Sequence, residues 1–134
     1  MATALYDKGR SAFAKGDIDW INDTIKAILI DSADYIVNLA THDFLDDVAG
    51  AARVATVELT NKSVAAGVCD CDNPTFADVS GDAFEAVVIY KHTGVEGTSQ
   101  LIAYIDNSAQ LPMTPIGGDI EMNIDSGANK LFKL

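Results

Sequence analysis

Two cysteines and two histidines are the residues of this 134-residue chain with the widest chemical repertoire. Cys69 and Cys71 stand at C-x-C spacing, whereas His42 and His92 lie in unrelated segments. A structural zinc site needs four ligands at suitable spacing, and this arrangement does not supply them. If the cysteines share one face of a strand, a disulfide between them would be strained. We therefore predict structural thiols and no metal site.

Neither histidine lies in a pattern typical of catalysis. His42 stands beside carboxylates in an expected helical turn, and His92 lies in an expected loop beside Thr93. Catalysis by a histidine base needs a nucleophile and an orienting group within hydrogen-bonding reach. The chain contains no nucleophile-elbow, metalloprotease, deaminase or phosphate-loop motif. We interpret both as surface histidines and predict a protein that is not an enzyme, with no catalytic residue and no cofactor.

Carboxylates recur in close pairs, namely Asp17/Asp19, Asp46/Asp47 and Asp70/Asp72. Such pairs perform acid–base chemistry in glycosidases, but composition alone produces them in a chain this acidic. The segment Asp70–Asn73 has the initial spacing of an EF-hand loop. Pro74 follows it, and the glycine and distal glutamate of that loop are missing. A small ion-binding or enzymatic domain is therefore kept only as an alternative.

The charge balance excludes several classes of partner. Twenty acidic and nine basic residues give a net charge of −11, which repels nucleic-acid phosphates and anionic membrane surfaces. Neither a membrane-spanning apolar run nor an apolar N-terminal signal segment is present in the sequence. We predict synthesis in a reducing cytoplasm, with no binding to nucleic acid or membrane. The charge suits a soluble surface, a basic partner surface or divalent cations held between carboxylates.

The stretch Asp82–Asp106 carries the densest apolar signal. The runs Ala83–Tyr90 and Leu101–Asp106 are apolar on both faces and flank the polar segment Lys91–Gln100. Two such runs predict a hairpin with a long connection. Strands that are apolar on both faces lie in the middle of a fold. We therefore expect this hairpin to form the centre of the core and to act as scaffold.

The remaining pattern predicts one mainly β domain, an antiparallel sandwich or small barrel with a short N-terminal helix and one short helical turn. Residues 1–23 would form an N-terminal arm or helix, with Trp20 plugging the core, and residues 24–134 the β core. The helix is expected over Thr3–Lys15, capped by Thr3 and stopped by Gly16, and the helical turn over Thr41–Val48, capped by Thr41. The expected strands are Thr24–Ile30, Tyr35–Leu39, Arg53–Thr60, Ser63–Cys71 with a bulge at Gly67, Thr75–Val79, Ile120–Ile124 and Lys130–Leu134.

Three stretches together carry a resemblance that covers nearly the whole chain: LYDKGRSAFAKGDIDWINDTIKAILID, DAFEAVVIYKHTG…TSQLIAYID and GGDIEMNIDSGANKLFKL. The chain resembles a recurring small structural protein of tailed-bacteriophage virions, of the capsid decoration (cement) type. The resemblance is a whole-chain pattern rather than a catalytic motif. It implies a virion location on the outside of the capsid, at junctions between subunits of the major capsid protein. It also implies a homo-oligomer, with a trimer favoured, and no catalytic residues.

Under this resemblance, three segments are expected to make contacts: the arm Ala2–Asp23, the Pro/Gly-containing loop Ser108–Gly118 and the hairpin loop Lys91–Gln100. The long loop Asn107–Gly118 lacks periodicity and suits a position next to a binding face. A tail, baseplate or head–tail completion component is the first alternative. A small ion-binding or enzymatic domain is the second.

Overall fold

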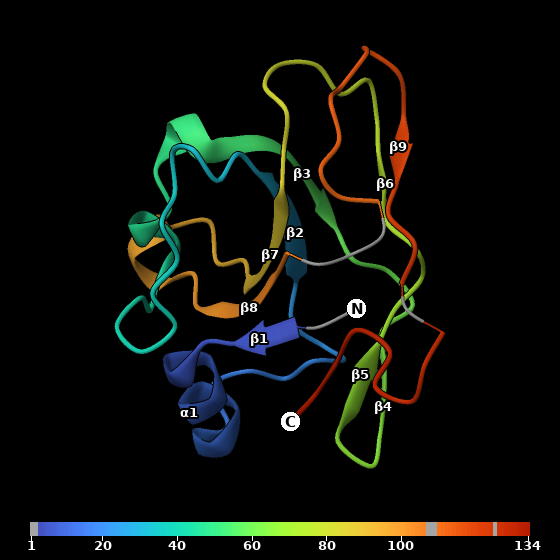
Figure 1. Ribbon diagram of the computed structural model, residues 1–134. Helices are drawn as coiled ribbons and strands as arrows, with labels where there is room; N and C mark the ends of the chain where they lie inside the picture. The colour runs from blue at the N-terminus through green and yellow to red at the C-terminus, as the bar shows by residue number, and fades with distance from the viewer. Residues whose placement is uncertain (1–2, 107–109, 125) are drawn as a thin grey trace.

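A five-stranded antiparallel sheet in the order β1-β8-β7-β2-β3 organises the fold (Figure 1). The computed structural model describes residues 3–106, 110–124 and 126–134. The strands are β1 (Thr3–Leu5), β2 (Ile25–Ile30), β3 (Arg53–Glu58), β7 (Ala86–Lys91) and β8 (Leu101–Ile105). Strand β7 lies in the middle, and every residue of β7 and β8 except Lys91 is buried. The expectation that Asp82–Asp106 forms a central hairpin is confirmed.

Two smaller antiparallel sheets pack beside the main one. One has the order β10-β5-β4 and the other pairs β6 with β9. Their strands are β4 (Ser63–Ala65), β5 (Val68–Asp70), β6 (Thr75–Phe76), β9 (Ile120–Glu121) and β10 (Phe132–Lys133). The helices are α1 (Asp7–Lys15) and the 3-10 turns η1 (Leu45–Asp47), η2 (Gly50–Ala52) and η3 (Glu96–Thr98). The predicted class, mainly β and antiparallel with a short N-terminal helix, is confirmed.

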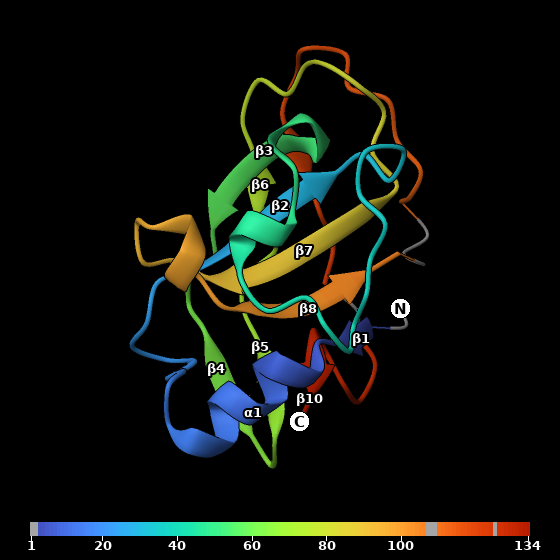
Figure 2. The ribbon, with the colours of Figure 1, turned by 90° about the vertical axis from the view of Figure 1, so that its left-hand side faces the viewer.

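The main sheet is buried on both faces because alternate residues of each strand point in opposite directions. Ala27 and Val87 belong to a core shared with α1 and the smaller sheets, and this shared core makes the arrangement sandwich-like. Ile28 and Val88 belong to a second core, covered by residues 31–52. Figures 1 and 2 show the main sheet between these two coverings.

The N-terminus differs from its prediction. Residues Thr3–Leu5 pair with β8, and α1 begins at Asp7 with Tyr6 as N-cap and no side-chain capping bond. The expected helical start and cap at Thr3 are therefore wrong, because main-chain pairing at the free edge of β8 outweighs local helix propensity. Residues 3–15 thus pack on the core through Leu5, Tyr6, Gly9 and Ala12, while the outer face of α1 is exposed. The expected stop at Gly16 is confirmed by its left-handed conformation, with φ of 82°.

Helix α1 packs closely on the backbone of β8 at Gly9. This glycine is buried, and a Cβ placed on it would lie only 2.5 Å from the carbonyl oxygen of Leu101. A glycine in a helix interior normally destabilises the helix. Here it is required, because any side chain would push α1 away from the sheet.

The segment Ser63–Cys71 is a tight hairpin and not the single bulged strand that was expected. Ala66 and Gly67 join β4 to β5 with φ of 51° and 80°. Two successive positive φ values are typical of a type I′ turn, which reverses the chain in two residues. The bulge prediction failed because Gly67 provides half of a turn.

Segment 35–48 also differs from its prediction. Residues 35–38 form no strand, and Tyr35 is buried in the second core instead. The expected helical turn is limited to η1, which Phe44 precedes without a side-chain cap. The cap expected at Thr41 is therefore wrong. The other predicted strands are present, although those after Ser63 are shorter than expected.

Candidate functional site

Both cysteines are interior thiols. Cys69 and Cys71 are buried in the larger core and unbonded to each other. Burial raises the pKa of Cys69 to about 11 and that of Cys71 to about 12. A protonated thiol is a poor nucleophile and metal ligand and packs like a small apolar side chain. Such burial is what the prediction of structural thiols requires.

Both histidines are half-buried, so each lies partly at the surface, as the interpretation as surface histidines expected, and partly in the protein. The ring of His92 meets that of Tyr90 edge-on, with centroids 6.1 Å apart. Its Nδ1 atom is buried without a hydrogen-bond partner among the residues that the structure describes. No Ser, Cys or carboxylate in that part of the chain contacts this nitrogen, so His92 lacks the partners that a general base needs.

His42 ends a hydrogen-bonded chain that begins in the interior. The hydroxyls of Tyr6 and Tyr35 are 2.7 Å apart, and the Tyr35 hydroxyl lies 2.8 Å from Nδ1 of His42. The main-chain N–H of Asn38 also donates to Nδ1, at 3.3 Å. Nδ1 is therefore an acceptor, which places the proton of the neutral ring on Nε2. It follows that Tyr35 donates to His42 and Tyr6 donates to Tyr35.

The hydrogen bonds that link Tyr6, Tyr35 and His42 join three segments that are distant in sequence. Tyr6 precedes α1, Tyr35 follows β2, and His42 precedes η1. The ring of Tyr35 stacks on that of His42 at 5.4 Å and lies 6.2 Å from that of Tyr104. Hydrogen bonds between buried hydroxyls and a histidine in an apolar core favour one arrangement of the segments that carry these groups. We assign the Tyr6–Tyr35–His42 hydrogen bonds the structural role of holding residues 31–48 on the main sheet.

Tyrosine ionisation gives a pH test of the second core. Burial is the main cause that raises the pKa of each of the four tyrosines, Tyr6, Tyr35, Tyr90 and Tyr104. For Tyr35 the pKa rises to about 12. This pKa exceeds the ordinary tyrosine value of about 10, so the folded state favours the neutral hydroxyl. The contribution of Tyr35 to folding stability is therefore fully present below about pH 10 and is lost as the pH rises toward 12. The buried thiols of Cys69 and Cys71 also favour the folded state only while they are protonated, so their contribution to folding stability is lost as the pH rises above about 9.

We expect less tyrosinate absorbance from the native protein near pH 10 than from the unfolded chain, and a rise in that absorbance when alkali unfolds the protein. Ultraviolet absorbance and circular dichroism measured along one alkaline titration check this. The urea-unfolded chain is the control and should titrate near pH 10. As much tyrosinate absorbance from the protein as from the unfolded chain, while the dichroism is still native, would contradict the expected burial.

The Asp70–Asn73 segment does not gather its oxygens around one point. Asp70 Oδ1 accepts the N–H of Cys71 at 2.9 Å, and Asn73 Oδ1 accepts the N–H of Ile124 at 2.8 Å. Asp72 Oδ2 accepts from the Asn61 side chain. Each of these three side chains thus makes its own local hydrogen bond. The calcium alternative gains no support here.

Two other carboxylate groups lie closer together. Within each, ligand atoms approach to within 4.8 Å; the groups are Asp31, Asp34, Asp82 and Asp43, Asp46, Asp47. Several of these oxygens accept local hydrogen bonds, such as Asp47 Oδ2 from the N–H of Asp43 at 2.8 Å. Exposed carboxylates gather readily in a chain of net charge −11. Proximity alone therefore assigns no ion to either group.

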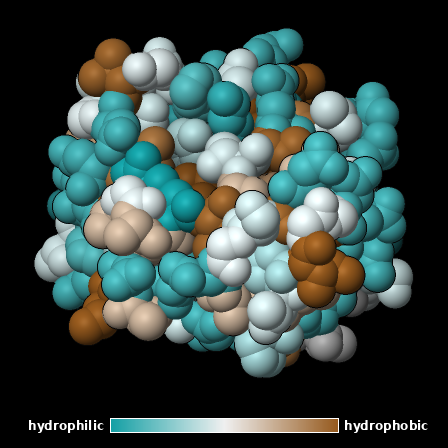
Figure 3. Space-filling view, turned by 90° about the horizontal axis from the view of Figure 1, so that it is seen from above, coloured by the Kyte–Doolittle hydropathy of each residue, from teal (hydrophilic) through white to brown (hydrophobic). Residues whose placement is uncertain are grey.

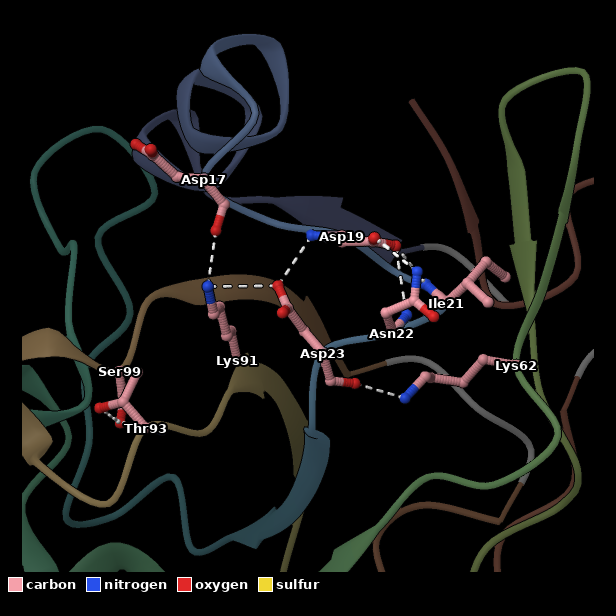
Figure 4. A network of polar contacts seen from close by, with 9 residues as sticks. All are labelled: Asp17, Asp19, Ile21, Asn22, Asp23, Lys62, Lys91, Thr93 and Ser99. Atoms are coloured by element: carbon pink, nitrogen blue, oxygen red, sulfur yellow. Dashed lines mark hydrogen bonds and ion pairs between the residues drawn. The ribbon is translucent and has the colours of Figure 1, made fainter.

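The Asp17/Asp19 pair belongs to an ordered loop (Figure 4). Asp19 Oδ1 accepts the N–H groups of Ile21 and Asn22 at 3.1 and 3.2 Å, and Asn22 Nδ2 donates to Asp19 Oδ2 at 2.7 Å. The side-chain hydrogen bond from Asn22 is the main cause that lowers the pKa of Asp19. A carboxylate held ionised in a turn stabilises that turn and is unsuited to donate a proton.

Two lysines, Lys91 of β7 and Lys62 just before β4, bind this loop through hydrogen bonds and an ion pair. Lys91 Nζ donates to the Asp17 carbonyl at 2.7 Å and pairs with Asp23 Oδ2 at 3.2 Å. Lys62 Nζ donates to the carbonyl of Asp23 (Figure 4). These contacts were not expected from sequence, because lysine and carboxylate patterns do not reveal which distant residues pair. They hold the loop around Trp20 against the body of the protein.

The hairpin loop Lys91–Gln100 is also ordered. Thr93 Oγ1 lies 2.7 Å from Thr98 Oγ1 and 3.2 Å from Ser99 Oγ. Arg53 Nη2 pairs with Glu96 at 2.8 Å and also donates to the Val48 carbonyl at 2.6 Å. The loop is thereby tied to η1, while Val95 remains 60% exposed. It offers a preformed surface rather than a catalytic pocket.

The cavities are small or shallow. A gap of about 20 Å³ between the main sheet and residues 122–124 is lined by Ala27, Val87, Met122 and other mainly apolar residues. Such a space holds about one water-sized probe. Two surface grooves of about 350 and 290 Å³ lie beside α1 and beside β4. Neither contains a histidine or cysteine. Among the described residues, no helix has the length and apolar character needed to cross a membrane.

Comparison of the sequence with protein-family models and with curated proteins found no match. In the described ranges, the histidines, cysteines and carboxylate pairs singled out from sequence make separate local contacts. Their geometry supports roles in holding the fold.

Proposed function

We propose that this chain is a non-enzymatic structural protein of a tailed-bacteriophage virion. It binds the outside of the capsid shell and stabilises the contacts between major capsid subunits. The observation that carries the proposal is the whole-chain resemblance, from the LYDKGR start through the central hairpin to the LFKL end. A rigid protein can brace a shell by adding contact area, without chemistry of its own.

The described polar groups support a binding role over catalysis. The Tyr6–Tyr35–His42 chain, the lysine-fastened loop and the Arg53 contacts all hold segments in place. Preformed loops lose little conformational freedom on binding, which favours affinity. This arrangement suits a protein whose function is to present a fixed surface.

The contact segments proposed from sequence need revision. Ala2 and Ser108, the first residues of two of these segments, lie outside the described residues. Strand β1 is occupied by pairing with β8, so the outer face of α1 and the exposed part of the following loop, such as Ile21, are what the described N-terminal segment offers for contact. The loop 110–118 and the hairpin loop around Val95 complete the proposed contacts with the capsid.

The test is co-sedimentation of purified protein with undecorated heads. We expect saturable binding at a fixed number of copies per shell, and shells that withstand higher temperature once bound. Replacing the exposed Val95 by aspartate should weaken binding about tenfold or more if this loop contacts the shell. Ile36→Asp is the matched control, because Ile36 is 86% exposed in a segment outside the proposed contacts.

Failure to co-sediment, together with absence of the protein from purified virions, would reject the proposal. Electron microscopy of labelled protein on virions separates it from the first alternative. Label confined to the tail, baseplate or head–tail junction would favour that alternative.

A further inference from the structure

One end of the molecule carries an apolar groove with a cationic rim. The groove, of about 350 Å³, is lined by Arg10, Phe13, Ala14 and Leu134. The three helical residues share one face of α1 because they are three and four positions apart. Leu134 is 51% exposed. The groove thus offers contact area for a single apolar side chain.

Arg10 lines this groove, and further basic residues lie on the same helix and near the last strand. Helix α1 carries Lys8, Arg10 and Lys15, Lys130 precedes the last strand, and Lys133 lies in it, which accounts for five of the nine basic residues of the chain. Acidic residues near these elements include Asp7, in the first turn of α1, and Asp17, which pairs with Lys15 at 3.5 Å. Asp70 of β5 lies beside Lys130 in the neighbouring groove. This end is therefore positive relative to a chain whose net charge is −11.

The opposite end carries a stiff protrusion made of residues 77–84 and 113–119. Phe84 and Met113 exchange two backbone hydrogen bonds of 2.9 and 3.0 Å. Further out, Val79 bonds to Gly118 at 3.0 Å and accepts from Gly117 at 2.8 Å. Figures 1 and 2 both show this protrusion at the end away from α1 and the C-terminus.

The protrusion presents an exposed isoleucine among carboxylates. Ile116 is 94% exposed, and the N–H of Asp78 is bonded to Asp119 Oδ1 at 3.0 Å in the neighbouring loops. Residues 77–84 and 113–119 contain three carboxylates and neither lysine nor arginine. Figure 3 looks onto this end and shows hydrophobic side chains separated by hydrophilic ones. Ile116 is thus a single apolar projection on an acidic surface.

We propose that copies of this chain associate head to tail, with Ile116 of one copy in the α1 groove of the next. The chain carries both complementary halves, an apolar projection with acidic surroundings and an apolar groove with a basic rim. Two copies repel each other in most orientations because of their net charge, and this contact brings opposite charges together. Contacting surfaces at opposite ends leave both free ends able to bind again. Such heterologous contacts build rings or filaments.

This inference concerns the isolated protein, and it uses two surfaces that are also proposed for capsid contact, the outer face of α1 and the loop 110–118. Its tests therefore use the protein without heads, so that its failure is distinct from a failure of capsid binding. Its direct test uses two single variants, Ile116→Cys and Ala14→Cys, mixed under mild oxidation. The native Cys69 and Cys71 are buried and do not compete. We expect a disulfide-linked dimer in the mixture, much less in either variant alone, and a ladder of covalent oligomers from the double variant. Linkage of Ile116→Cys to itself at an equal or greater yield, or no linkage in the mixture, would overturn the proposal.

Sedimentation of the unlinked protein provides a second, independent test. Ile116→Asp should weaken self-association about tenfold or more, and Arg10→Glu should weaken it in a salt-dependent way. The matched control is again Ile36→Asp, which should associate as the unmodified chain does. The proposal fails if the unmodified chain stays monomeric at millimolar concentration, or if Ile36→Asp has the larger effect.

Discussion

Replacing Trp20 by alanine is expected to lower the free energy of unfolding by about 3–5 kcal/mol. Trp20 is only 4% exposed and meets the ring of Phe132 edge-on at 5.2 Å. Its Nε1–H donates to the carbonyls of Ser63 at 3.0 Å and Asp70 at 3.3 Å. The indole thus joins the N-terminal loop to the β4–β5 hairpin, and its removal leaves a cavity and two carbonyls without this donor.

Urea unfolding followed by far-ultraviolet circular dichroism measures this loss, because the chain has a single tryptophan and fluorescence is lost with it. Trp20→Phe keeps an aromatic ring but removes the donor, so we expect an intermediate loss of about 1–3 kcal/mol. The control is the neighbouring Ile21, which is 45% exposed and should cost about 0.5 kcal/mol or less as alanine. Equal losses for Trp20→Ala and Ile21→Ala would contradict the role assigned to the indole.

Replacing Gly9 by alanine is expected to destabilise the protein by about 1–3 kcal/mol. Helix propensity alone predicts the opposite sign, a gain of about 1 kcal/mol from alanine in a helix interior. The added Cβ would lie 2.5 Å from the Leu101 carbonyl oxygen and 3.1 Å from Ile102 Cα. Both are backbone atoms of β8, so neither can turn aside as a flexible side chain would.

Gly50→Ala is the matched control for this substitution. Gly50 lies in η2, and a Cβ placed on it would meet no heavy atom within 4 Å beyond its immediate neighbours. Alanine there should be neutral or slightly stabilising, because it restricts the unfolded chain. Thermal and urea unfolding of both variants decide the matter. A more stable Gly9→Ala would show that α1 is not packed on β8 as described.

The central hairpin could be predicted from sequence because its signal is local. The runs ending at Tyr90 and Asp106 are apolar on both faces over several residues, and only a strand inside a sheet can bury both. The strand expected over Thr24–Ile30 was predicted from its β-branched residues, and the strand over Arg53–Thr60 from its alternation with one wet face; both signals are local too. The expected absence of a catalytic motif was also a local observation, since motifs are defined by spacing along the chain.

Other features depended on residues distant in sequence. Thr3–Leu5 became a strand because β8 offered a free edge, and Gly9 is essential only because α1 crosses that strand. Tyr6, Tyr35 and His42 gave no joint signal, since their hydrogen-bonded chain exists only after three segments meet.

Composition and periodicity therefore determined the mainly β class, the central hairpin and the acidic character of this protein. Tertiary structure decided the edge strand, the buried tyrosine–histidine chain and the placement of Ile116 and the α1 groove at opposite ends. The physical reason is the distance along the sequence between the residues that interact. Hydrophobic alternation records which side of a strand is buried, whereas hydrogen-bond partners and close backbone contacts depend on which distant segments pack together.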